Sequence, residues 1–414
     1  MTIKRPVAAI AAIGTELTLG QSSESNSEYL GRWLGQMGYP VRIVLKLPDD
    51  AGLVTEELRH IVHSADLILI TGGLGATHDD ITRDALAALL EKPLLPNSSL
   101  KARIGRMAPP GADYKSFIKQ AYLPKGAGFL EATAGTAPGI VAEYNDKVIY
   151  ALPGVPSEMK AMLEEVAQDL TGRFGRQPGI VVKGLKIIGV SEPVVAGQID
   201  PVIKRYPQLT VNILAKLGEI KLTVMGEEGL EVVIDQAVGE LADRLGGAAY
   251  GGDQDTISSV VGRLLVERRM KIAVAESLTA GLIASQIAET AGSSHYLIGG
   301  IVAYDNAAKE SLLSVSHETI ANKGAVSYEV ASAMAEGVRS ALRTDLGLSV
   351  TGIAGPGGGS PDKPVGLVFV GLAHQKGTEV KELALKGDRR SIQRKTAAAA
   401  LNVLRLFLLK ESAG

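Results

Sequence analysis

The chain has 414 residues, enough for two or three domains of ordinary size. Its 43 Lys+Arg against 45 Asp+Glu give a formal net charge of -2, and 4% of its residues are aromatic, so a protein built mainly to neutralise nucleic-acid phosphate and stack bases is disfavoured. Cysteine is absent, which excludes disulfides, thiolate nucleophiles and zinc–thiolate sites.

The first 171 residues alternate short apolar runs with helical patterns. Residues 7–13, 41–47, 67–70 and 148–152 are short and rich in Val, Ile, Leu and Ala, which is typical of strands covered by helices on both faces. Residues 26–37 and 50–64 are predicted to be helices, the second with Asp50 as its N-cap. The pattern predicts a doubly wound α/β domain over residues 1–171.

The apolar run near the N-terminus is a predicted strand and not an export signal. It is followed by Gly14, Thr15 and Glu16, with no convincing cleavage site and no apolar stretch of about 18 residues. We therefore expect a cytoplasmic protein.

The middle of the chain predicts a small α+β module over residues 177–249, after a linker at residues 172–179. Residues 180–190 and 220–224 are expected to be strands, and residues 230–245 a helix. Residues 246–255 are expected to be a break, with Asp255 capping a helix that begins near Thr256.

Residues 255–414 repeat the alternation and predict a second α/β domain. The expected helices are residues 257–268, 280–290, 328–343 and 391–409. The expected strands are residues 271–275, 297–304, 348–351 and 365–372.

Ser277, in AVAESLTAG, lies between a predicted strand and a predicted helix. A serine at such a junction is usually a helix N-cap, but its hydroxyl would also lie at the carboxyl edge of a sheet, near helix amides that stabilise negative charge. A nucleophilic serine needs a base. None of the six histidines fits a triad pattern, so a lysine with a lowered pKa is the alternative activator, and spacing alone does not identify it.

Four successive motifs resemble the CinA C-terminal (PncC-type) domain, a family of nicotinamide-nucleotide amidases: AESLTAG, GGIVAYDNAAK, TGIAGPGGGSPDKPVG and KGDRRSIQRK. The resemblance implies hydrolysis of nicotinamide mononucleotide to nicotinic acid mononucleotide and ammonia, without a cofactor. It implies Ser277 as the nucleophile and Tyr304 and Lys309 as the groups that handle its proton. These two residues are five apart, wrong for one helix face, but they can converge if Tyr304 ends a strand and Lys309 begins the next helix.

The same resemblance implies that a further set of residues binds the substrate: Thr279, Thr351, Gly352, Gly355, Arg389 and Arg394. The two arginines could grip the substrate phosphate. The family often has Cys-Thr-Gly-Gly after the nucleophile, whereas this chain has Ala280 where the first of those glycines stands, which we expect to affect affinity more than chemistry.

A glycine-rich turn follows the predicted strand at residues 67–70. Gly72, Gly73 and Gly75 are expected to let backbone approach a phosphate, although no P-loop pattern is present. Asp79 and Asp80 come just after the turn and Glu16 follows the first strand, so the three carboxylates are expected to converge on a divalent cation such as Mg²⁺. The alternative for the two aspartates is helix-capping charge.

The segments IGTELTLGQ…NSEYL, TGGLGATHDDITRD and LPGVPSEMK resemble the MoaB/MogA-like, molybdopterin-binding fold in its CinA version. The resemblance implies metal-dependent hydrolysis of ADP-ribose to AMP and ribose 5-phosphate. We add Glu158 to the expected metal ligands, with a first-turn helix charge as its alternative. The remaining expected binding residues are Gly14, Thr15, Asn26, Pro153 and Gly154.

Together these patterns predict an enzyme of pyridine-nucleotide salvage, with nicotinamide mononucleotide and ADP-ribose as small-molecule partners. We expect no nucleic-acid or membrane partner, and homo-oligomerisation from the family. Two alternatives stay open: a molybdopterin-handling transferase, and a non-catalytic competence-associated interaction protein.

Overall fold

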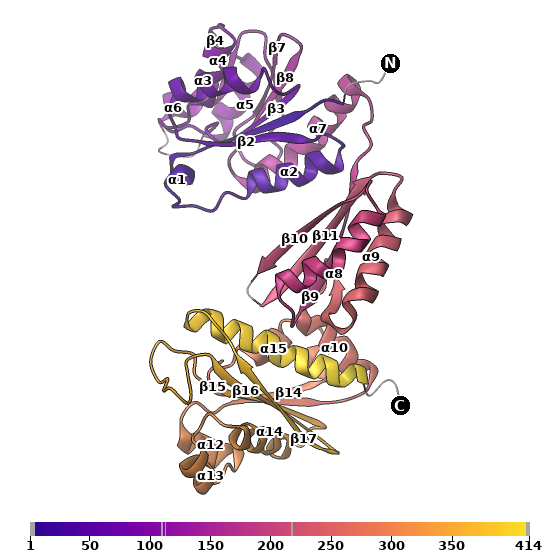
Figure 1. The fold of residues 1–414 in the computed structure, drawn as a ribbon. Helices are drawn as coiled ribbons and strands as arrows, with labels where there is room; N and C mark the ends of the chain where they lie inside the picture. Colours follow the sequence, from indigo (N-terminus) through magenta and orange to yellow (C-terminus); the bar gives the residue numbers. More distant parts are fainter. Residues whose placement is uncertain (1–4, 109–110, 112, 217, 411–414) are drawn as a thin grey trace. The chain divides into compact units, whose positions relative to one another are not determined.

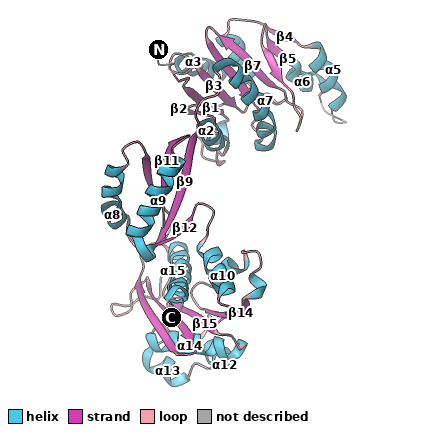
Figure 2. Cartoon of the chain, turned by 90° about the vertical axis from the view of Figure 1, so that its right-hand side faces the viewer, coloured by secondary structure: helices cyan, strands magenta, loops and turns pink. Residues whose placement is uncertain are grey.

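The computed structural model describes residues 5–108, 111, 113–216 and 218–410, which form two compact units, residues 1–181 and 182–414 (Figures 1 and 2). The first unit contains β1 (Ala8–Ile13), α1 (Thr15–Thr18), α2 (Asn26–Gln36), β2 (Val41–Leu47), α3 (Ala51–Ile61), β3 (Leu67–Thr71), α4 (Thr82–Leu89), β4 (Leu94–Pro96), α5 (Ser98–Met107), α6 (Tyr114–Ile118), β5 (Tyr122–Pro124), β6 (Gly128–Leu130), β7 (Gly139–Tyr144), β8 (Lys147–Leu152) and α7 (Pro156–Phe174).

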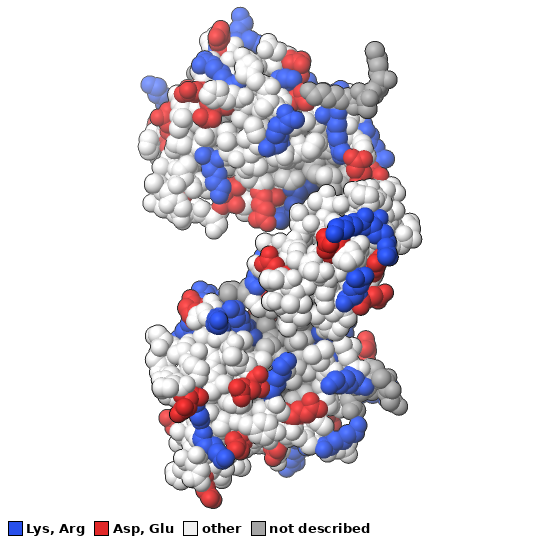
Figure 3. All heavy atoms as spheres, viewed as in Figure 1, with Lys and Arg blue, Asp and Glu red and all other residues white. Residues whose placement is uncertain are grey.

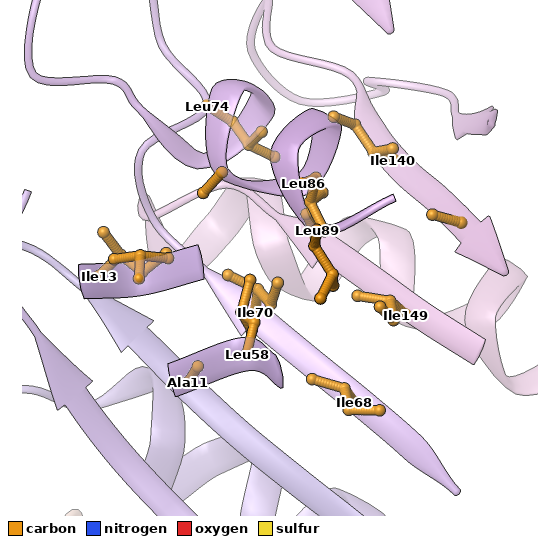
Figure 4. Packing of buried hydrophobic residues seen from close by; sticks show 14 of the residues in the cluster. Ala11, Ile13, Leu58, Ile68, Ile70, Leu74, Leu86, Leu89, Ile140 and Ile149 are labelled. Atoms are coloured by element: carbon orange, nitrogen blue, oxygen red, sulfur yellow. The ribbon is translucent and has the colours of Figure 1, made fainter. Parts of the chain in front are cut away.

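The main sheet of the first unit has the order β2-β1-β3-β8-β7-β6, in which the first four strands are parallel and β7 and β6 are antiparallel. Successive residues of β1 point to opposite faces, so Ala11 packs with α3 and α4 while Ile10 packs with α2 and α7. Figure 4 shows the first of these layers, where Leu58 of α3 and Leu86 of α4 meet the sheet. The expected doubly wound α/β fold is confirmed.

Local signals explain several boundaries in the first unit. The Asp50 side chain accepts a hydrogen bond from the Leu53 amide at 3.0 Å, as expected of an N-cap. The burial of β2 alternates, because β2 is an edge strand, so the expectation that it is covered on both faces is wrong. Helix α7 extends to Phe174, into the segment expected to be a linker.

The second unit contains two sheets. Its elements are β9 (Ile180–Ile188), α8 (Glu192–Arg205), β10 (Thr210–Lys216), β11 (Glu219–Glu227), α9 (Glu231–Leu245), β12 (Ala249–Gly252), α10 (Ile257–Glu267), β13 (Ile272–Glu276), α11 (Leu282–Ala288), β14 (Leu297–Val302), α12 (Asn306–Leu313), α13 (His317–Lys323), α14 (Tyr328–Leu342), β15 (Leu346–Gly352), β16 (Leu367–His374), β17 (Gly377–Ala384) and α15 (Arg389–Lys410).

The smaller sheet has the order β10-β11-β9-β12. Strand β12 lies in the segment expected to be a break, and pairs with β9. The N-cap of α10 is Thr256, which forms a capping box with Ser259, while Asp255 accepts from the Gly252 amide and pairs with Arg263. The expectation that Asp255 caps this helix is therefore wrong by one residue.

The larger sheet has the order β14-β13-β15-β16-β17, with β14, β13 and β15 parallel and the last two strands antiparallel. Helices α10, α11 and α15 pack on one face, where Leu265, Ile283 and Leu404 share a core with the strands. Helices α12, α13 and α14 cover the other face (Figure 1). The parallel strands β13, β14 and β15 therefore end at the same edge of a sheet that is covered on both sides.

Basic and acidic side chains are interspersed over the visible face of each unit (Figure 3). This mixture matches the formal net charge of -2. Of the helices in the described residues, none combines the length and apolarity needed to span a bilayer.

Candidate active sites

Ser277 is the first residue after β13, the strand between β14 and β15. Its amide donates to the Val350 carbonyl of β15 at 3.1 Å, and the preceding Glu276 carbonyl accepts from the Ala303 amide, just after β14, at 2.8 Å. The Ser277 backbone is therefore fixed between two neighbouring strands at their carboxyl edge. Its residue surface is 8% exposed.

The turn from Ser277 to α11 is held by the buried carboxylate of Glu276. This carboxylate accepts from the amides of Gly281, Ile283 and Ala284 at 2.8–3.1 Å, so the first amides of α11 are already bonded. The expectation that helix amides here point outward toward a developing negative charge is wrong for these three. Among the described contacts, the amides of Leu278 and Thr279 have no acceptor.

Ala280 lies in this turn with φ 51° and is followed by Gly281 with φ 98°. A left-handed conformation costs a non-glycine residue roughly 1 kcal/mol. The consequence of Ala280 is thus backbone strain within the turn that follows Ser277, more than bulk against a ligand.

Lys309 is 1% exposed and lies in α12, whose N-cap is Asp305, three residues after the end of β14. Its Nζ donates to the main-chain carbonyl of Tyr304 at 3.0 Å. Because Tyr304 follows Ala303, which is bonded to Glu276, this amine lies at the same sheet edge as Ser277. Burial lowers the pKa of Lys309 from its ordinary value, and the nearby Asp305 opposes the shift.

The Tyr304 side chain is 56% exposed, and its hydroxyl accepts from Arg389 at 2.6 Å. Arg389 also donates to the Gly355 carbonyl at 2.8 Å, which links the start of α15 to the glycine-rich segment after β15. Tyr304 thus meets Lys309 through its carbonyl and Arg389 through its phenol. The phenol was expected to share in handling the proton of Ser277, and this geometry places it with the expected phosphate-binding arginine instead.

Three other expected binding residues lie at or beside this edge. The Oγ1 of Thr279 is buried without a hydrogen-bond partner among the described residues. Thr351 and Gly352 end β15, and the Thr351 hydroxyl donates to the Ala325 carbonyl at 2.7 Å. Sequence reasoning missed Gln393, whose Nε2 donates to the Leu278 carbonyl at 2.7 Å and ties α15 to the turn after Ser277.

Arg394 is not brought together with Arg389 in a shared contact. It lines a separate cavity of about 1040 Å³ together with residues of the smaller sheet, among them Lys186 and Lys216. The two arginines that the motif groups together thus have different surroundings.

The first unit has a cavity of about 170 Å³ at the carboxyl ends of β1 and β3, where the order β2-β1-β3-β8 reverses direction. Such a switch point is where open α/β sheets bind ligands. The lining includes four expected site residues: Glu16, Asn26, Gly72 and Gly154.

Asn26 is the fixed polar group of this cavity. Its Nδ2 donates to Thr71 Oγ1 at 2.9 Å and to the Gly154 carbonyl at 2.8 Å. Thr71 Oγ1 in turn donates to the Pro153 carbonyl at 3.0 Å. Asn26 Oδ1 is buried and has no partner among the described residues, so one acceptor remains available to a ligand.

The glycine-rich turn is closely packed. Gly72 and Gly73 have φ 101° and 65°, and a Cβ on Gly72 would meet the Ile13 carbonyl. Beneath the turn, the fully buried Arg83 donates to the carbonyls of Leu74 and Gly75. Burial lowers the pKa of Arg83 to about 10.

Asp80 stabilises the glycine-rich turn through hydrogen bonds. Its carboxylate accepts from the Gly75 amide at 2.6 Å and from the Thr77 amide at 2.7 Å. Asp79 accepts from the Thr77 hydroxyl, which is the largest of the effects that lower the Asp79 pKa. Helix α4 begins later, with Ile81 at its N-cap and no side-chain cap, so neither aspartate caps it.

The four expected metal ligands do not assemble. Within residues 5–108, 111, 113–216 and 218–410, no group of three or more acidic or histidine side chains could hold a metal ion. Glu158 lies in the first turn of α7 against Gly135, and burial raises its pKa. The convergence of Glu16, Asp79 and Asp80 on one cation is therefore wrong for this structure, and these residues do not fit a metal site as they are placed.

Gly14 is the N-cap of α1, and Thr15 is the first residue of that helix. The Thr15 amide donates to Asp49 at 2.8 Å, and its hydroxyl accepts from the Asp49 amide at 3.1 Å. These contacts fix the start of α1, the short helix that carries Glu16 to the cavity.

Two family models match the chain. Residues 254–408 match the CinA C-terminal domain, and residues 9–172 match a probable molybdopterin binding domain. A competence-damage inducible protein of Acetivibrio thermocellus is 38% identical over 97% of this chain and 99% of its own length. A CinA-like protein of Dictyoglomus thermophilum is 38% identical over 97% of this chain and 98% of its own length.

Among solved structures, the protein CinA from Thermoplasma acidophilum is 29% identical, covers 40% of this chain and 98% of its own, and has a TM-score of 0.39. A competence/damage inducible protein from Agrobacterium tumefaciens is 37% identical, covers 37% of this chain and 96% of its own, and has a TM-score of 0.35.

Proposed function

The chain belongs to the CinA family, and from that premise we propose that its second unit hydrolyses the carboxamide of nicotinamide mononucleotide through Ser277. The observation that carries this proposal is the buried amine of Lys309 at the sheet edge that presents Ser277. A lysine with a lowered pKa has a neutral form that accepts a proton, which is what a serine nucleophile requires.

In the proposed reaction, Ser277 Oγ attacks the carboxamide carbon while its proton passes to Lys309 Nζ. The C–N bond then breaks as Lys309 returns the proton to the departing nitrogen. Ammonia departs, and the acyl group remains on Ser277 as an ester. Water attacks this ester, gives a proton to Lys309, and Ser277 recovers it as nicotinic acid mononucleotide departs. No cofactor enters any step.

The transition state carries negative charge on the former carbonyl oxygen. The amides of Gly281, Ile283 and Ala284 are engaged by Glu276, so we assign the stabilising donors to the free amides of Leu278 and Thr279. The buried, unpartnered Thr279 hydroxyl is an additional contact for substrate. Arg389, next to Tyr304, is assigned to the substrate phosphate.

The experiment is ammonia release from nicotinamide mononucleotide by Ser277→Ala. We expect turnover to be abolished while the thermal unfolding midpoint is kept. Ser285→Ala, an exposed serine on α11 of the same unit, is the matched control and is expected to turn over normally. Turnover by Ser277→Ala equal to that of the control would remove the assignment.

We propose a second activity for the first unit: hydrolysis of the pyrophosphate bond of ADP-ribose, which gives AMP and ribose 5-phosphate. It is supported by the cavity at the switch point of the sheet, with Asn26 Oδ1 available and a glycine-rich turn beside it. The four expected carboxylates do not come together in one group. The effect of a chelator on AMP formation therefore tests whether a divalent cation takes part.

AMP formation from ADP-ribose, with and without chelator, tests this second activity. Asn26→Ala removes one of the polar groups that line the cavity and is expected to reduce AMP formation at least tenfold. Asp146→Ala, exposed in the turn before β8, at the opposite end of the sheet, is the control. Equal AMP formation by both variants would contradict the assignment, and pterin binding without AMP formation would favour a molybdopterin-handling transferase.

The remaining expectations form part of the same proposal: a cytoplasmic homo-oligomer without a nucleic-acid or membrane partner. Light scattering after size exclusion tests the oligomeric state. A monomer at micromolar concentration would contradict that expectation.

A further inference from the structure

The cavity that Arg394 lines lies entirely within the second unit and is separate from the contacts around Ser277. Its volume is about 1040 Å³. One wall is formed by β9 and the β10–β11 hairpin, and the other by α10, α11 and α15. Its charged residues include four cations, Lys186, Lys216, Arg394 and Lys395, against two acids, Glu219 and Glu289.

Two of the four cations lie near a carboxylate outside the cavity lining: Lys186 helps to lower the pKa of Asp255, and Lys395 helps to lower the pKa of Asp388. Within the part of the chain that the structure describes, none of the four cations forms an ion pair. Lys186 donates to the Asp255 carbonyl and Lys395 to the Lys386 carbonyl, each at 2.6 Å, and a carbonyl carries no net charge. Glu219, one of the two acids, already accepts the Tyr250 hydroxyl. The side chains of Lys216 and Arg394 form no hydrogen bond or ion pair among the described residues, so these two cations are available to a ligand.

The cavity also has an apolar wall and a free acceptor. Ile188, Ile257 and Leu282 contribute apolar surface, and Gln286 Oε1 is buried with no partner among the described residues. A ring can lie on the apolar side chains, a hydroxyl or amine can donate to Gln286, and a phosphate can meet the cations. These three features together are those of a nucleotide.

The two walls of the cavity are joined by buried contacts, so their relative position is fixed. Ile188 of β9, Tyr250 of β12 and Val260 of α10 form one buried cluster. Arg405 of α15 is buried and donates to the Gly247 and Ala249 carbonyls, beside β12. Both contacts join the smaller sheet to the helices that cover the larger one.

We propose that this cavity is a second ligand site that binds a nucleotide through its phosphate and its base. It is distinct from the proposed amidase site, because Arg389 contacts Tyr304 and Gly355 while Arg394 lines this cavity together with Lys186 and Lys216. Its volume of about 1040 Å³ is slightly above the range of about 300–1000 Å³ that is usual for small-molecule sites.

The experiment is isothermal titration calorimetry of the full chain with AMP. Lys216→Glu reverses one cation of the cavity, and Lys381→Glu makes the same charge change on the exposed side of β17 as a matched control. We expect the wild type and Lys381→Glu to bind one more AMP per chain than Lys216→Glu, or to bind it at least tenfold more tightly. Thermal unfolding of each variant checks the fold.

The difference between Lys216→Glu and Lys381→Glu separates this site from any AMP bound as product in the first unit. Equal AMP binding by all three proteins would overturn the proposal, as would an equal loss in both variants. Titration with inorganic phosphate is the second arm. Phosphate that binds as tightly as AMP, with the same dependence on Lys216, would show an anion site only and would overturn the nucleotide assignment.

Discussion

Lys309→Met tests whether the buried amine is the base that activates Ser277. Methionine keeps the length and apolar character of the lysine stem and removes the amine, so packing around this 1%-exposed side chain is preserved. The change removes one hydrogen bond, the 3.0 Å contact of Nζ with the Tyr304 carbonyl.

The expected effects on stability and activity differ widely in size. A single hydrogen bond contributes about 0.5–1.5 kcal/mol, and removing a buried amine also removes its desolvation cost, so the free energy of unfolding should change by less than about 1 kcal/mol. Loss of a general base should lower turnover by about 10²–10⁴-fold, or roughly 3–5 kcal/mol in activation free energy. If Lys309 had only a structural role, its replacement would change the free energy of unfolding and leave turnover unchanged.

The assay pairs ammonia release from nicotinamide mononucleotide with urea unfolding, and uses Lys381→Met, an exposed lysine of β17, as the control. We expect the control to match the wild type in both measurements. Turnover by Lys309→Met within threefold of the control, in a folded protein, would refute the role of this amine.

Three further predictions rest on separate contacts. Burial lowers the pKa of Lys309 below 10.5, so the fraction of neutral, proton-accepting amine increases as pH rises. The value of kcat/KM for ammonia release should therefore increase with pH, with a midpoint below 10.5. A rate that does not change between about pH 6 and pH 10 would contradict this prediction. Glu276→Gln keeps the shape of the side chain but weakens the bonds that hold the start of α11, so urea unfolding should show a loss of about 1–3 kcal/mol, and an unchanged midpoint would mean that the carboxylate is not needed there. Asp80→Ala frees the Gly75 and Thr77 amides in the glycine-rich turn, so AMP formation should fall together with about 1–3 kcal/mol of stability, whereas a fall in AMP formation at full stability would indicate a direct role for the carboxylate.

The strongest sequence patterns led to the correct elements where local rules dominate. Buried runs such as residues 67–70 became β3 because a central parallel strand is covered on both faces, and Asp50 caps α3 because its side chain reaches the Leu53 amide. The edge strand β17, most of whose residues are exposed, and the seven-residue helix α13 carried too weak a pattern to be predicted. Strand β12 was hidden in a glycine-rich segment, and only its pairing with β9 makes it a strand.

The order of motifs in the chain determined which residues to consider: a serine after a strand, a lysine after the next, and glycine-rich turns in both α/β regions. What they contact was decided only by the tertiary structure. Parallel pairing of β13 with β14 brings Ser277 and Lys309 to one edge, and burial gives the lysine its lowered pKa. Hydrogen bonding commits Asp80 to its own loop, and helix packing puts Arg394 in a different cavity from the contacts of Arg389. The sequence shows which residues carry a charge. The partner of each charged group and its exposure to water depend on residues far away in the chain.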